Sequence, residues 1–167
     1  GDVLFVHASL SAISWVCGGA AAVCDALPHA VGKNGTVVMP AHNRSNSAPA
    51  KREAPPVPEA WHDTVREAMP PFDKDKAPSE GVGKIAECFR HYPETLRSGH
   101  PQTSFCMSGK DAAYITAGHA LTPQFGDNSR LEKACDWMPR CCSSASDTIV
   151  SQRFIMRKRC SRKRPSK

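Results

Sequence analysis

A continuous apolar run, Val3 to Val6, lies close to the start of the chain. An unbroken run that includes β-branched residues predicts a strand buried on both faces, as in a parallel sheet. Small polar residues follow it, then Gly18-Gly19, then a segment from Ala20 to Val31 whose apolar residues have helical spacing. This order is typical of α/β proteins that form a ligand crevice at the carboxyl ends of their strands. An ordinary strand-to-helix connection would show the same order.

A second continuous apolar run, Thr36 to Pro40, predicts a second buried strand. Its distance of about 35 residues from the first run fits one right-handed βαβ unit. Residues 41–58 are rich in Asn, Ser, Ala and Pro, and their position after the strand favours a substrate lid. The predicted fold class is therefore α/β, with a mixed or parallel sheet and flanking helices.

Further along, short helices are predicted over residues 58–69 and 83–91, and a short strand over residues 104–107. A turn rich in Arg, Ser and His precedes this strand. His100 stands before Pro101, which holds it in an extended conformation. A histidine in such a loop is a candidate general base or hydrogen-bond donor, and capping the turn is the alternative.

Length and composition predict one domain of 167 residues without a membrane span, because no apolar run approaches the ~20 residues that a span needs. No signal peptide is visible, and the chain starts with Gly1 rather than Met, as expected for a fragment of a longer protein. The eight cysteines include no Cys-x-x-Cys pair. Reduced thiols and a cytoplasmic location are expected.

The net charge of +6 comes from the end of the chain. Residues 151–167 hold eight of the 22 Lys and Arg residues and no acid, which leaves 14 basic against 16 acidic residues before them, a net charge of −2. A basic run can bind nucleic acid, but a solvated end is the commoner case. Only Phe154 interrupts it as an aromatic residue, so nucleic acid is not favoured as a partner.

Several short segments follow one another along the chain in an order that is typical of one family. Residues 1–19 carry Gly-Asp-Val, Val-His, Ser-Leu-Ser-Ala-Ile, Trp-Val and Gly-Gly. The later segments are 35–40, 55–58 with Trp61, 66–70, 72–73, 81–87, Arg97-Ser98 with His100-Pro101, Ser104-Phe105, and Leu121 with 126–129. This ordered set, over residues 1–133, resembles the aminoglycoside 3-N-acetyltransferases. That family has its own α/β fold, and the chain resembles an incomplete copy of it.

The resemblance implies transfer of acetyl from acetyl-coenzyme A to the 3-amino group of an aminoglycoside, a reaction that confers antibiotic resistance. It implies two walls of a coenzyme cleft. The residues expected there are His7, Ser9, Leu10, Ser11, Gly18 and Gly19 on one wall, and Thr103, Ser104 and Phe105 on the other. Asp127 is implied as a carboxylate that faces the sugar. His62, His91 and His119 have no such support and are expected at the surface.

The resemblance ends where residues 134–148 begin, because these have neither strand nor helix periodicity. The family continues with an apolar strand, a Gly-x-Gly-x-Asp segment and a helix that carries the catalytic base. Trp137 and Met138 are each encoded by a single codon, so the bases at these two positions are known. Reading residues 136–139 one base out of step gives Leu-Asp-Ala. The same shift at Cys141-Cys142 gives an apolar residue and Leu, and at residues 146–148 it allows Gly followed by Tyr or His. The shifted frame thus allows the family's continuation.

We therefore hypothesise a frameshift near residues 133–136, which divides the chain into a partial acetyltransferase domain, 1–133, and an out-of-frame, disordered basic tail, 134–167. Sequencing the gene across this junction should show a broken codon phase. An intact phase, together with a mass of the natural protein that matches the printed sequence, would contradict the hypothesis. If the frameshift is real, catalysis should be weak or absent, leaving at most a remnant that binds coenzyme A.

Overall fold

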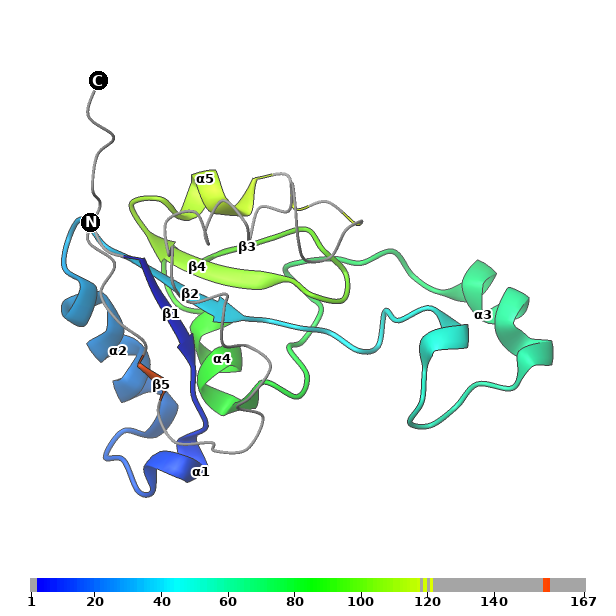
Figure 1. Ribbon diagram of the computed structural model, residues 1–167, viewed down its shortest axis with the longest axis horizontal. Helices are drawn as coiled ribbons and strands as arrows, with labels where there is room; N and C mark the ends of the chain where they lie inside the picture. Colours follow the sequence, from blue (N-terminus) through cyan, green and yellow to red (C-terminus); the bar gives the residue numbers. More distant parts are fainter. Residues whose placement is uncertain (1–2, 118, 120, 122–154, 157–167) are drawn as a thin grey trace.

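A mixed β-sheet forms the centre of the computed structural model, which describes residues 3–117, 119, 121 and 155–156 (Figure 1). The strands are β1 (Val3–His7), β2 (Thr36–Pro40), β3 (Leu96–Arg97), β4 (Phe105–Gly109) and β5 (Ile155–Met156), in the order β3-β4-β2-β1-β5. β1 and β2 are parallel, whereas β4 is antiparallel to β2 and to β3, and β5 is antiparallel to β1. The predicted fold class is confirmed, and the sheet is mixed rather than parallel.

The helix α2 (Gly19–Val31) connects the parallel strands β1 and β2, as the sequence predicts. Pro28 lies inside this helix and does not end it. α4 (Gly83–Arg90) lies beside α2 on the same face of the sheet, and α5 (Ala112–Thr116) covers the opposite face (Figure 1). A short helix, α1 (Leu10–Ile13), follows β1 directly.

Alternation along the strands divides the buried side chains between these two faces. Val37 and Met39 of β2 pack with Leu27 of α2 and Phe89 of α4. Val38, one residue away, packs on the other face with residues of β4 and α5. All five residues of β2 are buried, which explains why this strand is continuously apolar in the sequence.

The segment between β2 and α4 leaves the sheet as a lobe, defined here as residues 48–70 (Figure 1). It contains two 3₁₀ turns, η1 (Pro49–Lys51) and η2 (Glu59–Trp61), and the helix α3 (His62–Ala68). The helix predicted over 58–69 therefore begins with a 3₁₀ turn. Its role as a lid stays a prediction.

The buried side chain of Arg97 attaches the base of this lobe to the sheet. Its guanidinium donates to the carbonyls of Ala41 (2.7 Å), Lys74 (3.1 Å) and Ala77, and to the hydroxyl of Ser104 (3.0 Å). Its Cζ also lies 5.2 Å from the centre of the Phe72 ring. No carboxylate of the described residues pairs with Arg97, so burial lowers its pKa, and carbonyl oxygens balance the charge.

Two glutamates fasten the chain that returns from the lobe. Glu80 accepts hydrogen bonds from the backbone N–H groups of Arg44 and Ser45, while Glu87 of α4 accepts them from Ser79 and Arg90. Burial alone would raise the pKa of Glu87, but the hydrogen bonds from Arg90 and Ser79 outweigh it and lower the pKa to about 2. Both ends of the lobe are thus held against the sheet.

Two expectations about the chain as a whole have different outcomes. Among the described helices, none is long and apolar enough to cross a membrane. The division at residue 133 stays a prediction, because residues 134–167 lie outside the described residues except for β5, which pairs with His7 and Val6.

Replacing Arg97 with Met should reduce the free energy of unfolding by about 3 kcal/mol, because several buried carbonyls lose their donor. Chemical denaturation of the full chain measures this change. Arg66→Met is the control, since Arg66 forms only an exposed pair with Asp63 and should cost less than about 1 kcal/mol. Equal losses in both variants would show that the carbonyl contacts of Arg97 do not stabilise the fold.

Candidate active site at the carboxyl ends of β1 and β2

Three segments lie at the same edge of the sheet: residues 8–11 after β1, residues 41–43 after β2, and residues 100–104 before β4. β4 is antiparallel to β2, so its first residue, Phe105, pairs with the last residue of β2, Pro40. The pairing continues beyond the strands, since Ala41 N donates to Ser104 O (2.8 Å) and Asn43 N donates to Gln102 O (3.0 Å). The two predicted walls of the coenzyme cleft therefore flank β2.

The first wall contains a compact polar turn. The hydroxyls of Ser9 and Ser11 lie 2.8 Å apart, and the Ser9 carbonyl accepts hydrogen bonds from the first turn of α1. Gly18 and Gly19 have φ values of +80° and +61°, a conformation that favours glycine. A Cβ on Gly18 would lie 3.0 Å from Ala22, whereas nothing lies within 4 Å of one on Gly19. Gly19 is the more open of the two.

In the second wall, the three predicted residues differ in accessibility. Ser104 is fully buried, and its hydroxyl donates to the Ala41 carbonyl (2.6 Å) while accepting from Arg97. Phe105 is also buried, and its ring packs against Phe5. Thr103 is half-buried, which makes it the member of this wall whose side chain can reach a ligand.

His100 is 2% exposed and caps the turn in which it lies. Its Nδ1 accepts hydrogen bonds from the backbone N–H groups of Gln102 (3.1 Å) and Thr103 (2.9 Å). Two N–H donors directed at Nδ1 require a lone pair there, so the neutral ring carries its proton on Nε2. His100 can therefore donate a hydrogen bond from Nε2, and this atom has no partner among the described residues.

His119, which was expected at the surface, is half-buried. Its ring centre lies 4.8 Å from that of His100 and 6.2 Å from that of Phe105, and its Nδ1 is 3.0 Å from the Ser98 hydroxyl. His91 is exposed, as expected. His62 is half-buried within the lobe, where its Nε2 lies 3.1 Å from the Val57 carbonyl.

The sequence analysis missed His42, which stands two residues after β2 and between the two walls. Its ring meets Phe105 edge-on at 5.4 Å between centres, and its carbonyl accepts a hydrogen bond from Glu80 N (2.7 Å). Burial lowers the pKa of His42, and nearby His7, His100 and Arg44 lower it further. This shift favours the neutral form of the ring. Its position just beyond a buried strand was the available signal.

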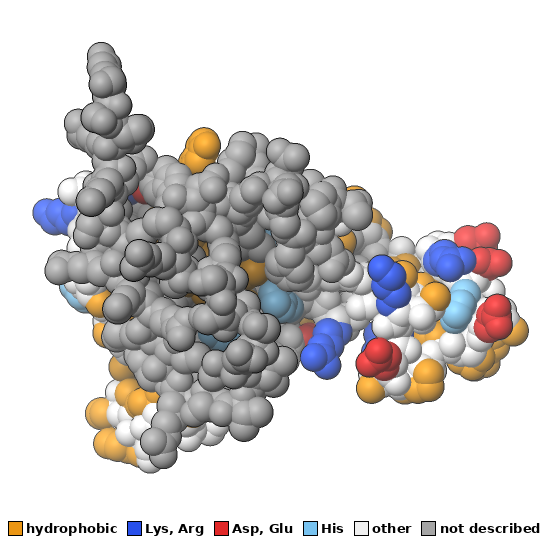
Figure 2. All heavy atoms as spheres, in the orientation of Figure 1, with side chains coloured by type: hydrophobic (Ala, Val, Ile, Leu, Met, Phe, Trp, Pro, Cys, Tyr) orange, Lys and Arg blue, Asp and Glu red, His pale blue; other side chains and the backbone are white. Residues whose placement is uncertain are grey.

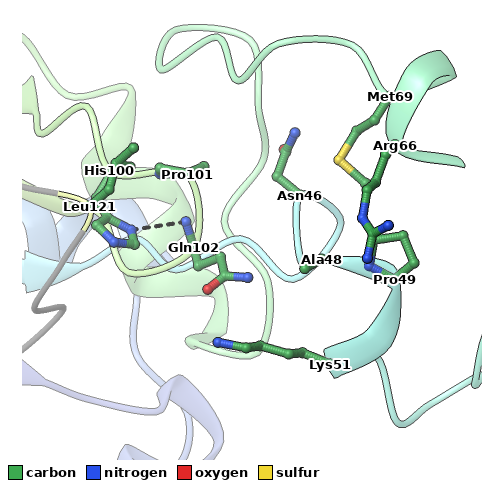
Figure 3. A pocket seen from close by; sticks show the side chains of 10 residues that line it. All are labelled: Asn46, Ala48, Pro49, Lys51, Arg66, Met69, His100, Pro101, Gln102 and Leu121. Atoms are coloured by element: carbon green, nitrogen blue, oxygen red, sulfur yellow. Dashed lines mark hydrogen bonds between the residues drawn. The ribbon is translucent and has the colours of Figure 1, made fainter. Parts of the chain in front are cut away.

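A cavity of about 350 Å³ lies between the His100–Gln102 turn and the lobe (Figure 3). Lys51 of η1 and Arg66 of α3 line it from the lobe side. The remaining lining residues are Asn46, Ala48, Pro49, Met69, His100, Pro101, Gln102 and Leu121.

Two of the four cysteines among the described residues are buried in the core. The described residues contain no group of three or more His, Cys, Asp or Glu side chains that could hold a metal ion. Cys17, Cys24, Cys88 and Cys106 are free thiols there. Burial raises the pKa of both Cys24 and Cys106 to about 12, so these two are packing residues rather than nucleophiles.

This arrangement defines an α/β protein with polar segments gathered at the carboxyl ends of its central parallel strands. Comparison with known proteins identifies the family. A family model described as aminoglycoside 3-N-acetyltransferase matches residues 5–138. The aminoglycoside N(3')-acetyltransferase-like protein YokD of Bacillus subtilis is 45% identical over 134 residues, 80% of this chain and 49% of that protein. Aminoglycoside N(3)-acetyltransferase VIII of Streptomyces fradiae is 35% identical over 136 residues, 80% of this chain and 46% of that protein.

Solved structures give the same assignment. The crystal structure of YokD from B. subtilis has a TM-score of 0.73 and covers 78% of this chain and 53% of that one at 45% identity. AAC-IIIb with CoASH has a TM-score of 0.67 and covers 81% and 50% at 34% identity. The chain belongs to the aminoglycoside 3-N-acetyltransferase family, and it spans about half the length of these relatives. Asp127 lies outside the described residues.

The imidazole of His42 should titrate below its ordinary pKa of 6.5. A lowered pKa in the folded state contributes stability that is present above pH 6.5 and lost as the pH falls through the folded pKa. NMR titration of the histidine ring signals, assigned with His42→Gln, tests this. A midpoint at or above 6.5 would contradict the burial of this ring.

Proposed function

We propose that this chain provides the coenzyme-binding part of an N-acetyltransferase that moves acetyl from acetyl-coenzyme A to the 3-amino group of an aminoglycoside. The supporting observation is that the Ser9–Ser11 turn and Thr103 lie at the same edge of the sheet, on either side of β2. The relative AAC-IIIb, whose structure contains CoASH, supports the same use of the fold. Acceptance of aminoglycosides rests on relatives such as AAC-VIa, whose structure contains sisomicin.

The residues at this edge fit a thioester ligand. His7, Ser9, Leu10, Ser11, Gly18, Gly19 and Thr103 would hold the coenzyme, while the buried Ser104 and Phe105 support Thr103 from behind. When bound, acetyl-coenzyme A supplies the activated acetyl group. Its carbonyl oxygen gains negative charge during attack, and fixed N–H donors stabilise such charge. The Nε2–H of His100 is one donor of this kind near the edge.

The attacking amine must lose a proton, which requires a base. His100 does not provide one through Nδ1, because that nitrogen already accepts two hydrogen bonds. Among the described residues, His42 is the candidate base, because burial favours the neutral form of its ring. Asp127 would face the cationic sugar.

The enzyme would act in the cytoplasm, where the free thiols of this chain stay reduced.

A second candidate is a remnant that binds coenzyme A without transferring acetyl. This candidate rests on the hypothesised frameshift near residues 133–136, because the family's catalytic helix is expected to follow that point. Calorimetry against coenzyme A, together with a thiol-release assay on several aminoglycosides, separates the candidates. Binding with release supports the enzyme, binding alone supports the remnant, and no binding contradicts both.

Ser11→Tyr should weaken coenzyme A binding at least tenfold, because a bulky ring would occupy the first wall beside Ser9. Lys33→Tyr is the matched control, since it adds the same ring to an exposed turn before β2, at the opposite end of the strand. Isothermal titration calorimetry measures both. Equal affinity in the two variants would place the coenzyme elsewhere.

A further inference from the structure

The cavity beside the candidate active site has an unbalanced charge. Its lining includes two cationic side chains, Lys51 and Arg66, and no carboxylate among the described residues. Arg66 donates to Asp63 (2.7 Å), but this pair is exposed and Asp63 does not line the cavity. Lys51 has no ion-pair partner in the described part of the chain. Such a pocket attracts anions and repels a polycation.

The walls of the cavity are held in place. On the sheet side, Gln102 is fixed by hydrogen bonds from its N–H to His100 and from Asn43 N to its carbonyl. On the lobe side, Asn46 N donates to the Asn43 side chain (3.3 Å), and Asn46 Nδ2 donates to the Pro70 carbonyl (3.4 Å). Lys51 extends from η1 toward the turn that carries Gln102 (Figure 3). The ammonium group therefore points from the lobe toward a turn that is fixed by hydrogen bonds.

The position of the cavity connects it with the coenzyme walls. Gln102, which lines the cavity, directly precedes Thr103 of the second wall. Lys and Arg side chains also gather where the lobe joins the rest of the molecule (Figure 2). A ligand that contacts Thr103 can place a charged group in the cavity without leaving the sheet edge.

We propose that this cavity is an oxyanion-binding site, in which Lys51 binds a phosphate group and Arg66 adds positive charge. Two sources have this chemistry: the phosphates of coenzyme A, and an anionic group on the acceptor amine. In either case the polycationic ring system of an aminoglycoside lies outside the cavity. The proposal does not depend on acetyl transfer, because phosphate binding can be measured by itself.

The experiment compares Lys51→Gln with Lys110→Gln in the full chain. Lys110 is exposed after β4, at the far end of the sheet, so the control removes the same charge away from the cavity. Titration with inorganic pyrophosphate, followed by backbone amide shifts, should perturb Gln102 and Lys51. Lys51→Gln should weaken binding about tenfold, the effect of one charged hydrogen bond, and added salt should weaken it further. Unchanged binding in Lys51→Gln, or no perturbation at Gln102, would overturn the proposal.

A second measurement identifies the source of the anion. If coenzyme A supplies it, Lys51→Gln should weaken coenzyme A binding and leave pantetheine binding unchanged. If the acceptor supplies it, Lys51→Gln should weaken pyrophosphate binding and leave coenzyme A binding unchanged; both results support the site. Failure of the unmodified chain to bind coenzyme A, with pyrophosphate binding retained, would reject the proposed function and leave the anion site standing.

Discussion

The buried guanidinium of Arg97 is the contact on which the position of the lobe depends. It is a cation without a carboxylate partner among the described residues, and its charge is balanced by carbonyls of the chain on both sides of the lobe and by the Ser104 hydroxyl. A buried charge is tolerated only when its donors are satisfied, so the chain around Ala41, Lys74 and Ala77 has little freedom to move. The same contacts orient Ser104, which lies behind the candidate coenzyme wall. Arg97 therefore holds both the chain beside the lobe and the candidate coenzyme wall in place.

The mixed sheet explains why the site contains residues distant in sequence. β1 and β2 are parallel, so both end at the same edge, while the antiparallel β4 begins there. A wholly parallel arrangement would place the start of β4 at the opposite edge and separate Thr103 from Ser9. Because Ala41 and Asn43 continue the pairing with residues 102–104, the second wall is fixed by backbone hydrogen bonds. Side-chain variation in that wall can then alter the ligand without disturbing the sheet.

Local sequence patterns predicted most of the central elements. β1, α2, β2 and α4 lie where continuous apolar runs or helical spacing placed them, because these segments are buried against one another. The short β3 and α5 were not predicted, since two and five residues carry too little periodicity. His42 and His119 were also missed or misplaced, because their neighbours come from tertiary contacts with Phe105 and His100. The positive charge of the lobe suggested no site in the sequence, because Lys51 and Gln102 line the same cavity only in the folded chain.

The tautomer of His100 shows how a local contact limits the possible chemistry of the whole edge. Once the N–H groups of Gln102 and Thr103 occupy Nδ1, the ring donates from Nε2 and no longer serves as a base. In the proposed acetyl transfer, proton removal would then fall to His42 or to a group outside the described residues. On the functions proposed above, the described part of the chain would stabilise negative charge, through His100 at the sheet edge and through Lys51 in the cavity. That is the requirement of the coenzyme and of a developing oxyanion, and a cationic acceptor needs carboxylates from elsewhere.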